Sequence, residues 1–368
     1  MYSTHRSKTI CSKMARAFPG YSVMFFMHKK TLVLLLSTFC ASTYIHAKTD
    51  CYPSSPPVVK QLDQVYYGMN NLRIFYTTSS DNALTFQQDK NLNHIPDYVE
   101  NIAIQANSIR KAWSVLGYQD PLNSPRYKND VKYIDIQIQK LNGLGLAYDE
   151  PHRHINNPLK KNACALIILI SNNIPNLTTN SSLIAHELFH LYTYGYTMFK
   201  QPWLTESLAA WSEGIIRKDK LGIYGQRNLP ENEEDFEKYV LQRTYRTSQL
   251  WNRLTTLIDR SDGKLFLPLS LMQQKYTDGQ PVFQDKYLKG TLFIRKFLEN
   301  LGRQDQKISV LNNWNLYHWN EIDQNSAHFN EQILDTLLIT LESTVERNIE
   351  KNKFKNLLKK IVKNKKTN

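Results

Sequence analysis

The sequence lacks an apolar run long enough to span a bilayer, and it contains no internal repeat or long low-complexity segment. A membrane-spanning helix needs about 20 apolar residues, and neither 31–41 nor 163–170 reaches that length. The absence of a fixed repeat excludes solenoids and propellers. With 41% hydrophobic and 21% charged residues, the 368-residue chain is typical of a globular protein with a sizeable core.

The central part of the chain also lacks an excess of positive charge, although the formal net charge is +13. Of the 46 Lys and Arg residues, six lie in 1–47 and eight in 351–368, two segments without acidic residues. Residues 48–350 therefore carry 32 basic and 33 acidic side chains. Nucleic-acid binding needs a basic surface on the folded body, so this distribution argues against it. The lysines at the end predict a basic tail, whose helically spaced apolar residues allow weak association with anionic surfaces.

The N-terminus predicts a secretory signal peptide. Two lysines precede the apolar segment 31–41, and the small residue Ala47 follows it. A basic start, an apolar stretch of about 7–15 residues and a small residue at the cut form the signal-peptide pattern. We expect translation to start at Met27 or Met24 and the mature protein, secreted or periplasmic, to begin near Lys48. The alternative is an N-terminal membrane anchor.

Cysteine is scarce, with four in the chain. Cys11 and Cys40 fall in the expected signal region, which leaves Cys51 and Cys164. An even pair in an exported protein predicts one disulfide between them. The alternative is two separate buried thiols.

Hydrophobic periodicity predicts strands in the first half of the chain and helices in the second. Three segments have the composition of strands: 72–76, 133–138 and 163–170. Apolar residues at intervals of three and four predict a helix over 97–116, ended by Gly117. Helices are also expected over 181–211 and 287–301.

This order of elements predicts an α+β fold. We expect four parts along the chain: an extended N-terminus with the signal peptide (1–47), a strand-rich lobe (48–180), a helical lobe (181–350) and the basic tail (351–368).

Residues 183–190, Leu-Ile-Ala-His-Glu-Leu-Phe-His, contain an HExxH motif. On a helix, His186 and His190 project from one face and can reach one metal ion. Glu187 can address water in the open position of that ion, where zinc lowers the pKa of water and a carboxylate accepts its proton. The motif predicts a zinc hydrolase, but it supplies only two of the three protein ligands of a catalytic zinc.

Residues 203–211, Trp-Leu-Thr-Glu-Ser-Leu-Ala-Ala-Trp, complete a larger pattern. HExxH followed by W-L-x-E-[GS]-x-A resembles the gluzincin peptidases, the group that contains thermolysin and aminopeptidase N. In that group the glutamate of the second helix is the third zinc ligand. The resemblance therefore implies that Glu206 binds zinc with His186 and His190, and that Glu187 is the general base.

Glu213 is the alternative third ligand. It follows Glu206 by two helical turns, so it faces a similar direction but lies roughly 10 Å further along the axis. That separation favours Glu206. Glu213 otherwise hydrogen-bonds a ligating histidine, as such sites usually require, or stays solvated.

The same resemblance implies a substrate edge and a tyrosine. Zincin peptidases lay an extended substrate along the edge of the strand before the zinc helix, here 164–170, although a fully buried strand is equally compatible with its composition. Tyr287 opens a Tyr-Leu-Lys-Gly segment similar to the Y-x-K-G segment of the aminopeptidase N family, whose tyrosine hydrogen-bonds the tetrahedral intermediate. Tyr192, Tyr194 and Tyr196 are the competing candidates. In aminopeptidase N relatives a GxMEN-type segment holds the amino terminus of the substrate. Its absence here favours an endopeptidase or a narrow-purpose protease.

Residues 89–100 have the oxygen spacing of an EF-hand loop. The candidate calcium ligands are Asp89, Asn91, Asn93, Ile95 (through its carbonyl), Asp97 and Glu100. His94 stands where glycine normally makes the sharp turn. The alternative is a polar Asx-turn that caps the following helix. Similar segments, followed by a Trp-bearing helix and a later HELFH, occur in a family of predicted secreted bacterial metalloproteases, which the chain resembles over most of 85–300.

Together these patterns predict a zincin-like secreted endopeptidase that uses Zn²⁺, with Ca²⁺ as a second cofactor, and acts on polypeptides. The catalytic candidates are Glu187 and Tyr287. Two alternatives remain: a zinc hydrolase of a non-peptide amide, and a non-catalytic secreted surface protein that binds zinc or calcium.

Overall fold

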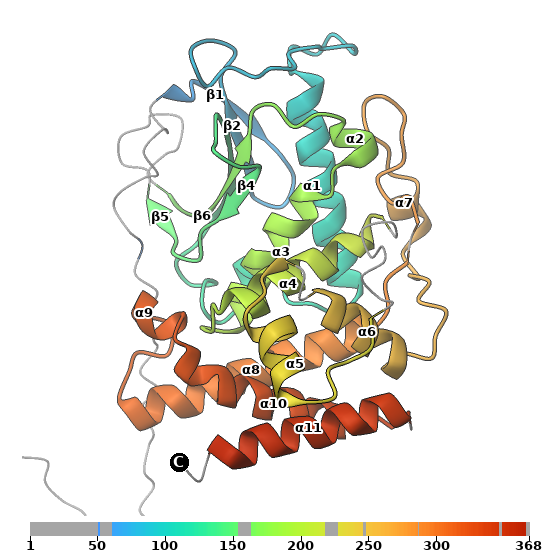
Figure 1. Cartoon of the computed structure of the whole chain (residues 1–368). Coiled ribbons are helices and arrows are strands. Elements are labelled where there is room, and N and C mark those ends of the chain that lie inside the picture. The colour runs from blue at the N-terminus through green and yellow to red at the C-terminus, as the bar shows by residue number, and fades with distance from the viewer. Residues whose placement is uncertain are drawn as a thin grey trace, which may run out of the picture. The chain divides into compact units, whose positions relative to one another are not determined.

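A computed structural model of the chain, shown in Figure 1, describes residues 51, 61–153, 163–217, 227–245, 248–285, 287–345 and 348–365. The expected signal peptide, its alternative as an anchor, and Cys11 and Cys40 lie outside these residues. All of the described residues belong to one unit of the chain, His46–Asn368.

Six strands within the described ranges form one mixed sheet, in the order β1-β2-β3-β6-β4 with β5 also paired to β6. They are β1 (Gln64–Tyr67), β2 (Leu72–Tyr76), β3 (Tyr133–Gln139), β4 (Gly145–Ala147), β5 (His152–Arg153) and β6 (Cys164–Ser171). Strands β2, β3 and β6 run parallel, whereas β1 is antiparallel to β2, and β4 and β5 are antiparallel to β6. The three strands predicted from periodicity are all present.

Strand β6 lies inside the sheet, which explains its uninterrupted apolar sequence. It pairs with β3 on one side and with β4 and β5 on the other, and all eight of its residues are buried. Leu166, Ile168 and Ile170 join the main core, while Ala165 and Ile167 belong to a smaller apolar cluster. Because side chains alternate along a strand, these sets lie on opposite faces. Of the two alternatives for 164–170, the buried strand is therefore confirmed and the substrate edge is wrong, and β4 ends the described sheet at this side.

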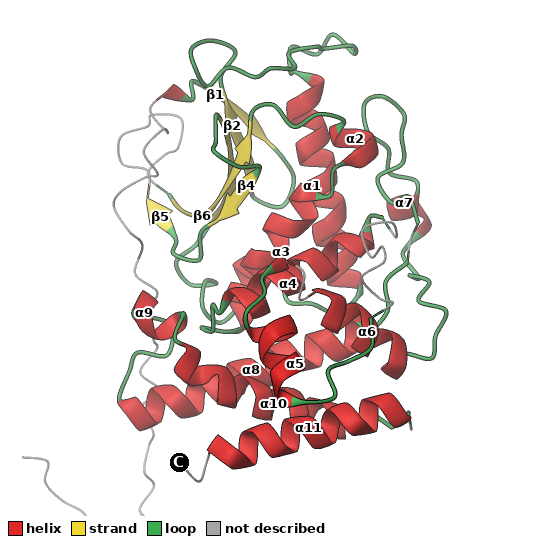
Figure 2. Cartoon of the chain, in the orientation of Figure 1, coloured by secondary structure: helices red, strands yellow, loops and turns green. Residues whose placement is uncertain are grey.

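Helices α1 (Asp97–Val115) and α3 (Leu183–Tyr196) lie on the same side of the sheet, and further helices continue away from it (Figures 1 and 2). The longer ones are α4 (Pro202–Ser212), α6 (Ser248–Ile258), α8 (Thr291–Asn312), α10 (Asn330–Glu342) and α11 (Ile349–Lys365). The short ones are α2 (Leu177–Asn180), α5 (Glu233–Phe236), α7 (Leu269–Met272) and α9 (Glu321–Gln324). Helices and a mixed sheet together make this an α+β fold, as predicted.

Two helix predictions need correction at their boundaries. The helical run expected over 181–211 is divided, because the chain leaves helical geometry at Thr197 and a proline begins α4 at Pro202. The helix expected from Tyr287 begins at Thr291. Gly290 precedes it with φ +77°, a left-handed conformation that glycine adopts without strain. The helix over 97–116 is confirmed, and it ends before Gly117.

The predicted basic tail is helix α11, which packs against α10 and α6. Its apolar residues are buried in the main core: Phe354, Leu357, Leu358, Ile361 and Val362. Several of its lysines form ion pairs within the chain, as Lys353 does with Glu231 and Lys359 with Glu342. The apolar side of the tail is therefore used for folding, which leaves only exposed lysines for contact with an anionic surface. Among the described residues, no helix combines the length and apolar character needed to span a membrane.

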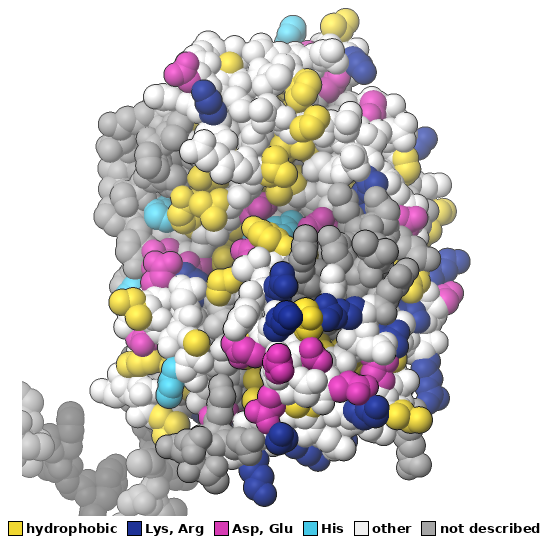
Figure 3. All heavy atoms as spheres, in the orientation of Figure 1, with side chains coloured by type: hydrophobic (Ala, Val, Ile, Leu, Met, Phe, Trp, Pro, Cys, Tyr) yellow, Lys and Arg dark blue, Asp and Glu magenta, His cyan; other side chains and the backbone are white. Residues whose placement is uncertain are grey.

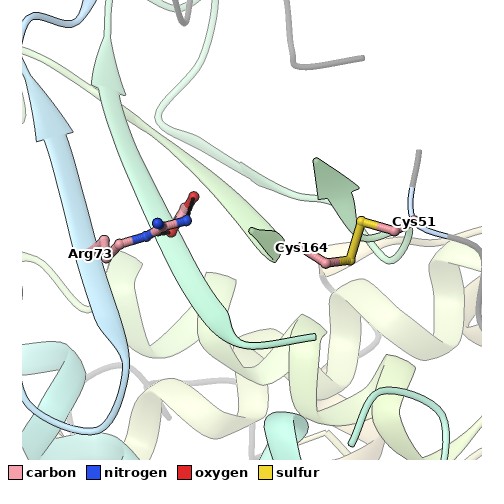
Figure 4. Close-up of a disulfide and its surroundings, with 4 residues drawn as sticks. Cys51, Arg73 and Cys164 are labelled. Carbon is pink, nitrogen blue, oxygen red and sulfur yellow. Dashed lines mark hydrogen bonds and ion pairs between the residues drawn. A yellow bond between two sulfur atoms is a disulfide. The ribbon is translucent and has the colours of Figure 1, made fainter. Parts of the chain in front are cut away.

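A disulfide attaches Cys51 to the sheet, and a buried ion pair links two of the strands (Figure 4). The predicted disulfide joins Cys51 to Cys164 at the start of β6, with a Cα–Cα distance of 6.0 Å. On β2, Arg73 extends toward β3 and donates two hydrogen bonds to the carboxylate of Asp135, at 2.7 and 2.8 Å. Both side chains are fully buried. Bidentate pairing offsets the cost of removing these two charges from water.

We expect replacement of both disulfide cysteines, Cys51→Ser with Cys164→Ser, to lower the free energy of unfolding by about 2–5 kcal/mol. The link spans a sequence separation of 113 residues, and a long closed loop restricts the unfolded chain strongly. Urea unfolding of oxidised and reduced protein measures the effect. The double variant must be insensitive to reductant, and equal stability of the oxidised wild type and the variant would contradict the expectation.

Candidate metal centre

Helices α3 and α4 bring three predicted ligands together. His186 and His190 lie one turn apart on α3, and Glu206 lies on α4. The Oε2 atom of Glu206 is 3.4 Å from His186 Nε2 and 3.6 Å from His190 Nε2. Within the described ranges these three residues are identified as a group that could hold a metal ion, with one ligand atom from each and all of these atoms within 4.8 Å of one another.

The segment between α3 and α4 is tied to α8, and this attachment sets the position of Glu206 relative to the histidines. Asp305 of α8 is buried and accepts hydrogen bonds from Thr197 Oγ1 and from the Met198 backbone N–H. Burial raises the pKa of Asp305 to about 7, despite these two hydrogen bonds. The few residues between the helices therefore form a defined turn, from which α4 packs directly against α3.

Glu213 takes a different position from Glu206. It begins the short helix η4 (Glu213–Ile215) after α4, and its Oε1 lies 3.0 Å from His186 Nδ1. Its second oxygen accepts a hydrogen bond from the Ser182 hydroxyl. Glu213 therefore contacts the nitrogen of His186 that is turned away from Glu206. This contact orients the imidazole and leaves Nε2 available as a ligand atom.

Glu187 is buried beside the histidines, next to strand β4. A Cβ atom placed on Gly145 would lie only 2.5 Å from Glu187 Oε1. Any side chain at this position would therefore displace the carboxylate, so glycine is required by close approach. The sequence contained no local signal for this contact, because Gly145 and Glu187 belong to elements far apart in the chain.

The buried charges shift the pKa values of the cluster in opposite directions. Burial lowers the pKa of His186, but hydrogen bonds to Glu206 and Glu213 outweigh this effect and raise it to about 10. Burial raises the pKa of Glu206, yet its hydrogen bonds to His186 and His190 hold that pKa well below its ordinary value. Burial raises the pKa of Glu187, and the two histidines offset part of that rise. In the metal-free state the cluster thus keeps a proton on His186, between two carboxylates.

Tyr245 is a site residue that sequence analysis missed. Its ring centroid lies 5.7 Å from that of His186, and burial and then the nearby charge of Glu206 raise the pKa of its hydroxyl. It is 58% exposed, so the ring covers one side of the cluster from the solvent side. Tyr245 follows Glu206 by many residues and belongs to no recognisable motif, so only the fold shows its proximity.

Tyr287, the tyrosine predicted to be catalytic, lies beside Lys264 and Gly263. It forms an isolated β-bridge with Lys264, and its ring lies beside Gly263. Burial raises its pKa, and the charges that raise it further belong to Asp259 and Asp262. These contacts do not include the histidine cluster, and a catalytic role for Tyr287 stays a prediction.

Of the three competing tyrosines, one contacts a histidine of the cluster. Tyr192 is fully buried in the core, and the Tyr196 hydroxyl accepts a hydrogen bond from the Gln119 backbone. Tyr194 stacks on His190, with ring centroids 5.8 Å apart and planes inclined by 15°.

The predicted calcium loop folds around Glu100. The amides of Asn91 and Asn93 donate hydrogen bonds to its two carboxylate oxygens, at 2.9 and 2.8 Å. Asp89 accepts hydrogen bonds from the backbone of Asn93 and His94. His94 has φ +67°, the left-handed conformation that glycine usually provides in such loops.

The other two candidate calcium ligands lie at the end of this loop. The carboxylate of Asp97 lies 3.4 Å from the Lys90 backbone N–H, and the backbone N–H of Ile95 donates to Asn93 Oδ1. No side chain caps α1 at its N-cap, Pro96, so the Asx-type bonds stabilise the loop and not the helix end. Calcium binding stays a prediction.

On the face shown in Figure 3, histidine side chains gather near the middle with acidic and hydrophobic side chains around them. Comparisons of the chain with protein-family models, with curated proteins and with solved structures found no match. The site is therefore interpreted from its own geometry. Two imidazole nitrogens and one carboxylate oxygen form a donor set that could hold a metal ion.

We expect Zn²⁺ binding to the metal-free protein at pH 7 to release a proton from His186. The pKa of about 10 keeps this imidazole charged, whereas a metal needs its unprotonated nitrogen. At pH values below that pKa, the affinity for Zn²⁺ should therefore rise about tenfold for each unit by which the pH is raised. Calorimetry in buffers of different ionisation enthalpy counts the protons released.

Glu213→Gln is the matched variant for this measurement. It removes one of the two carboxylates that raise the pKa of His186, so proton release should decline at a lower pH in the variant than in the wild type. Identical pH profiles of proton release would contradict the charged pair.

Proposed function

We propose that the chain is a secreted zinc-dependent endopeptidase with a zincin-like fold and a gluzincin-type ligand set. The position of Glu187 carries this proposal. Its carboxylate is buried next to the group His186, His190 and Glu206 without belonging to it. A structural metal site needs only ligands, whereas an adjacent carboxylate outside the ligand set suits a general base.

In the proposed reaction, three residues of the site bind the metal ion and a fourth transfers the proton. His186, His190 and Glu206 would hold the ion, and three protein ligands leave a position for water and substrate. When bound, zinc supplies Lewis acidity to water and to a substrate carbonyl. Glu187 accepts the proton of the attacking water and holds it until the leaving amine takes it. Its raised pKa, caused by burial, brings its basicity closer to neutral pH.

The position of strand β4 at the end of the described sheet is evidence for a polypeptide substrate. The Leu144 carbonyl and the Tyr148 N–H bond to β6. In an antiparallel pair the hydrogen-bonding direction alternates, so the backbone groups of Gly145 and Ala147 point to the open side. An extended peptide can add there as a further strand. Because Gly145 also contacts Glu187, a peptide on this edge would pass next to the general base.

Two other features support the proposal. One is the disulfide, and the other is a tyrosine that can donate a hydrogen bond at the site. The disulfide fits an oxidising compartment, where such bonds persist. The Tyr245 ring lies beside the candidate ligand His186 and is exposed, so its hydroxyl could donate a hydrogen bond to a substrate oxygen during the reaction. We therefore assign to Tyr245 the role that sequence analysis assigned to Tyr287.

We expect the purified protein to hydrolyse casein, and phenanthroline to abolish this activity until zinc is restored. Glu187→Gln should lower the rate by about 10²–10⁴-fold, the contribution typical of a general base. Because Glu187 is outside the ligand set, the variant should retain one zinc per chain, measured by atomic emission. A zinc-loaded wild type as inert as Glu187→Gln on varied polypeptides would contradict a peptidase. It would leave a non-peptide amide hydrolase or a binding protein.

The variants Tyr245→Phe and Tyr287→Phe discriminate between the two tyrosines. Loss of an oxyanion donor costs about 10²–10³-fold in kcat with little change in KM. We expect this loss for Tyr245→Phe and near wild-type kcat for Tyr287→Phe. Zinc content must be measured in both, since Tyr245 also contacts the candidate ligand His186. The reverse pattern would restore Tyr287 as the catalytic tyrosine.

A further inference from the structure

We propose that Tyr194 is a positioning residue that holds His190 by ring stacking, in place of the hydrogen bond that orients His186. This inference rests on the proposed metal site and names a residue that determines its affinity. The two histidines occupy equivalent places on α3, yet the structure surrounds their outer nitrogens differently.

The Nδ1 atom of His190 is buried without a hydrogen-bond partner among the described residues. The whole side chain is only 4% exposed. In contrast, His186 Nδ1 lies 3.0 Å from a carboxylate oxygen of Glu213. A ligating histidine usually gives its second nitrogen to a carboxylate or carbonyl, which fixes the ring orientation. The His190 ring must be oriented by other means.

The Tyr194 ring provides that orientation. Residues four apart on a helix lie on the same face, so Tyr194 covers the His190 ring from the following turn. The planes differ by 15° at a centroid distance of 5.8 Å, an offset stacked arrangement. Rotation of the imidazole about its side-chain bonds would break this contact, so the stack restricts the ring to orientations that keep Nε2 near Glu206.

Tyr194 is itself held from outside the helix. Its carbonyl oxygen accepts a hydrogen bond from the Arg126 guanidinium at 3.2 Å. The ammonium of Lys200 lies 5.9 Å from the centre of its ring, within the range of a cation–π contact. Both cations pair with the buried carboxylate of Asp149, at 2.7 and 2.6 Å. This ionic network makes Tyr194 a rigid support for the imidazole.

The aromatic ring of Tyr194, and not its hydroxyl, orients the His190 imidazole. Tyr194→Phe keeps the ring and should change zinc affinity by no more than about twofold. Tyr194→Leu removes the stack while keeping an apolar side chain, and zinc affinity should fall about 10–100-fold, as for other groups that orient a metal ligand.

The test is competition for Zn²⁺ against a chromophoric chelator, with the visible spectrum of the Co²⁺-loaded protein as a second readout. Tyr196→Leu is the matched control, because it makes the same change on the same helix without touching His190; Tyr196 packs against Tyr118. Thermal unfolding of the metal-free variants separates folding from metal binding. Tyr194→Leu should alter the Co²⁺ spectrum, whereas Tyr194→Phe and Tyr196→Leu should preserve it.

Two results would overturn the inference while leaving the metal site intact. One is Tyr194→Leu binding zinc as tightly as the wild type with an unchanged Co²⁺ spectrum. The other is an equal loss in Tyr194→Phe and Tyr194→Leu, which would assign the effect to the hydroxyl. If the wild type itself binds neither ion, the proposed metal site fails together with this inference.

Discussion

The contact of the buried His186 with two partly buried carboxylates, Glu206 and Glu213, is the interaction on which the site depends. A charged group that is removed from water is tolerated only when it is paired with good geometry. This requirement fixes how α4 and the following turn η4 pack against α3. It also explains why the metal-free cluster holds a proton: without a cation, the imidazolium supplies the positive charge that the carboxylates need.

The sheet and the helical part each contribute something that the other cannot. The sheet provides β4, whose residue Gly145 leaves room for Glu187 and whose open side can accept an extended chain. The helical part provides Asp305, which ties the segment between α3 and α4 to α8. The candidate metal ligands and Glu187 all belong to the helical layer, and the sheet packs against that layer at Gly145. Close packing of those layers keeps their separation constant.

Sequence reasoning worked where the information is local. The motif residues His186, Glu187 and His190 share one helical turn, so their mutual position follows from helix geometry alone. The strands and α1 were equally accessible through periodicity. Distant contacts decided what the sequence left open or predicted wrongly. The sequence allowed β6 to be either a buried strand or an edge, and it is internal because β4 and β5 pair beside it. The helix expected from Tyr287 begins only after Gly290.

The sequence by itself determined the chemistry available to the protein: an HExxH helix, a glutamate on the next helix and two cysteines that form a disulfide. Only the tertiary structure decided how these groups are used. It placed Glu206 near Nε2 of both histidines and Glu213 at Nδ1 of His186. The sequence did not distinguish these positions, because the two glutamates are separated by two helical turns and were both candidate ligands. The tertiary structure also brought Tyr245 and Gly145 to the cluster from remote segments. Such contacts depend on packing between elements, and no local pattern of residues encodes that packing.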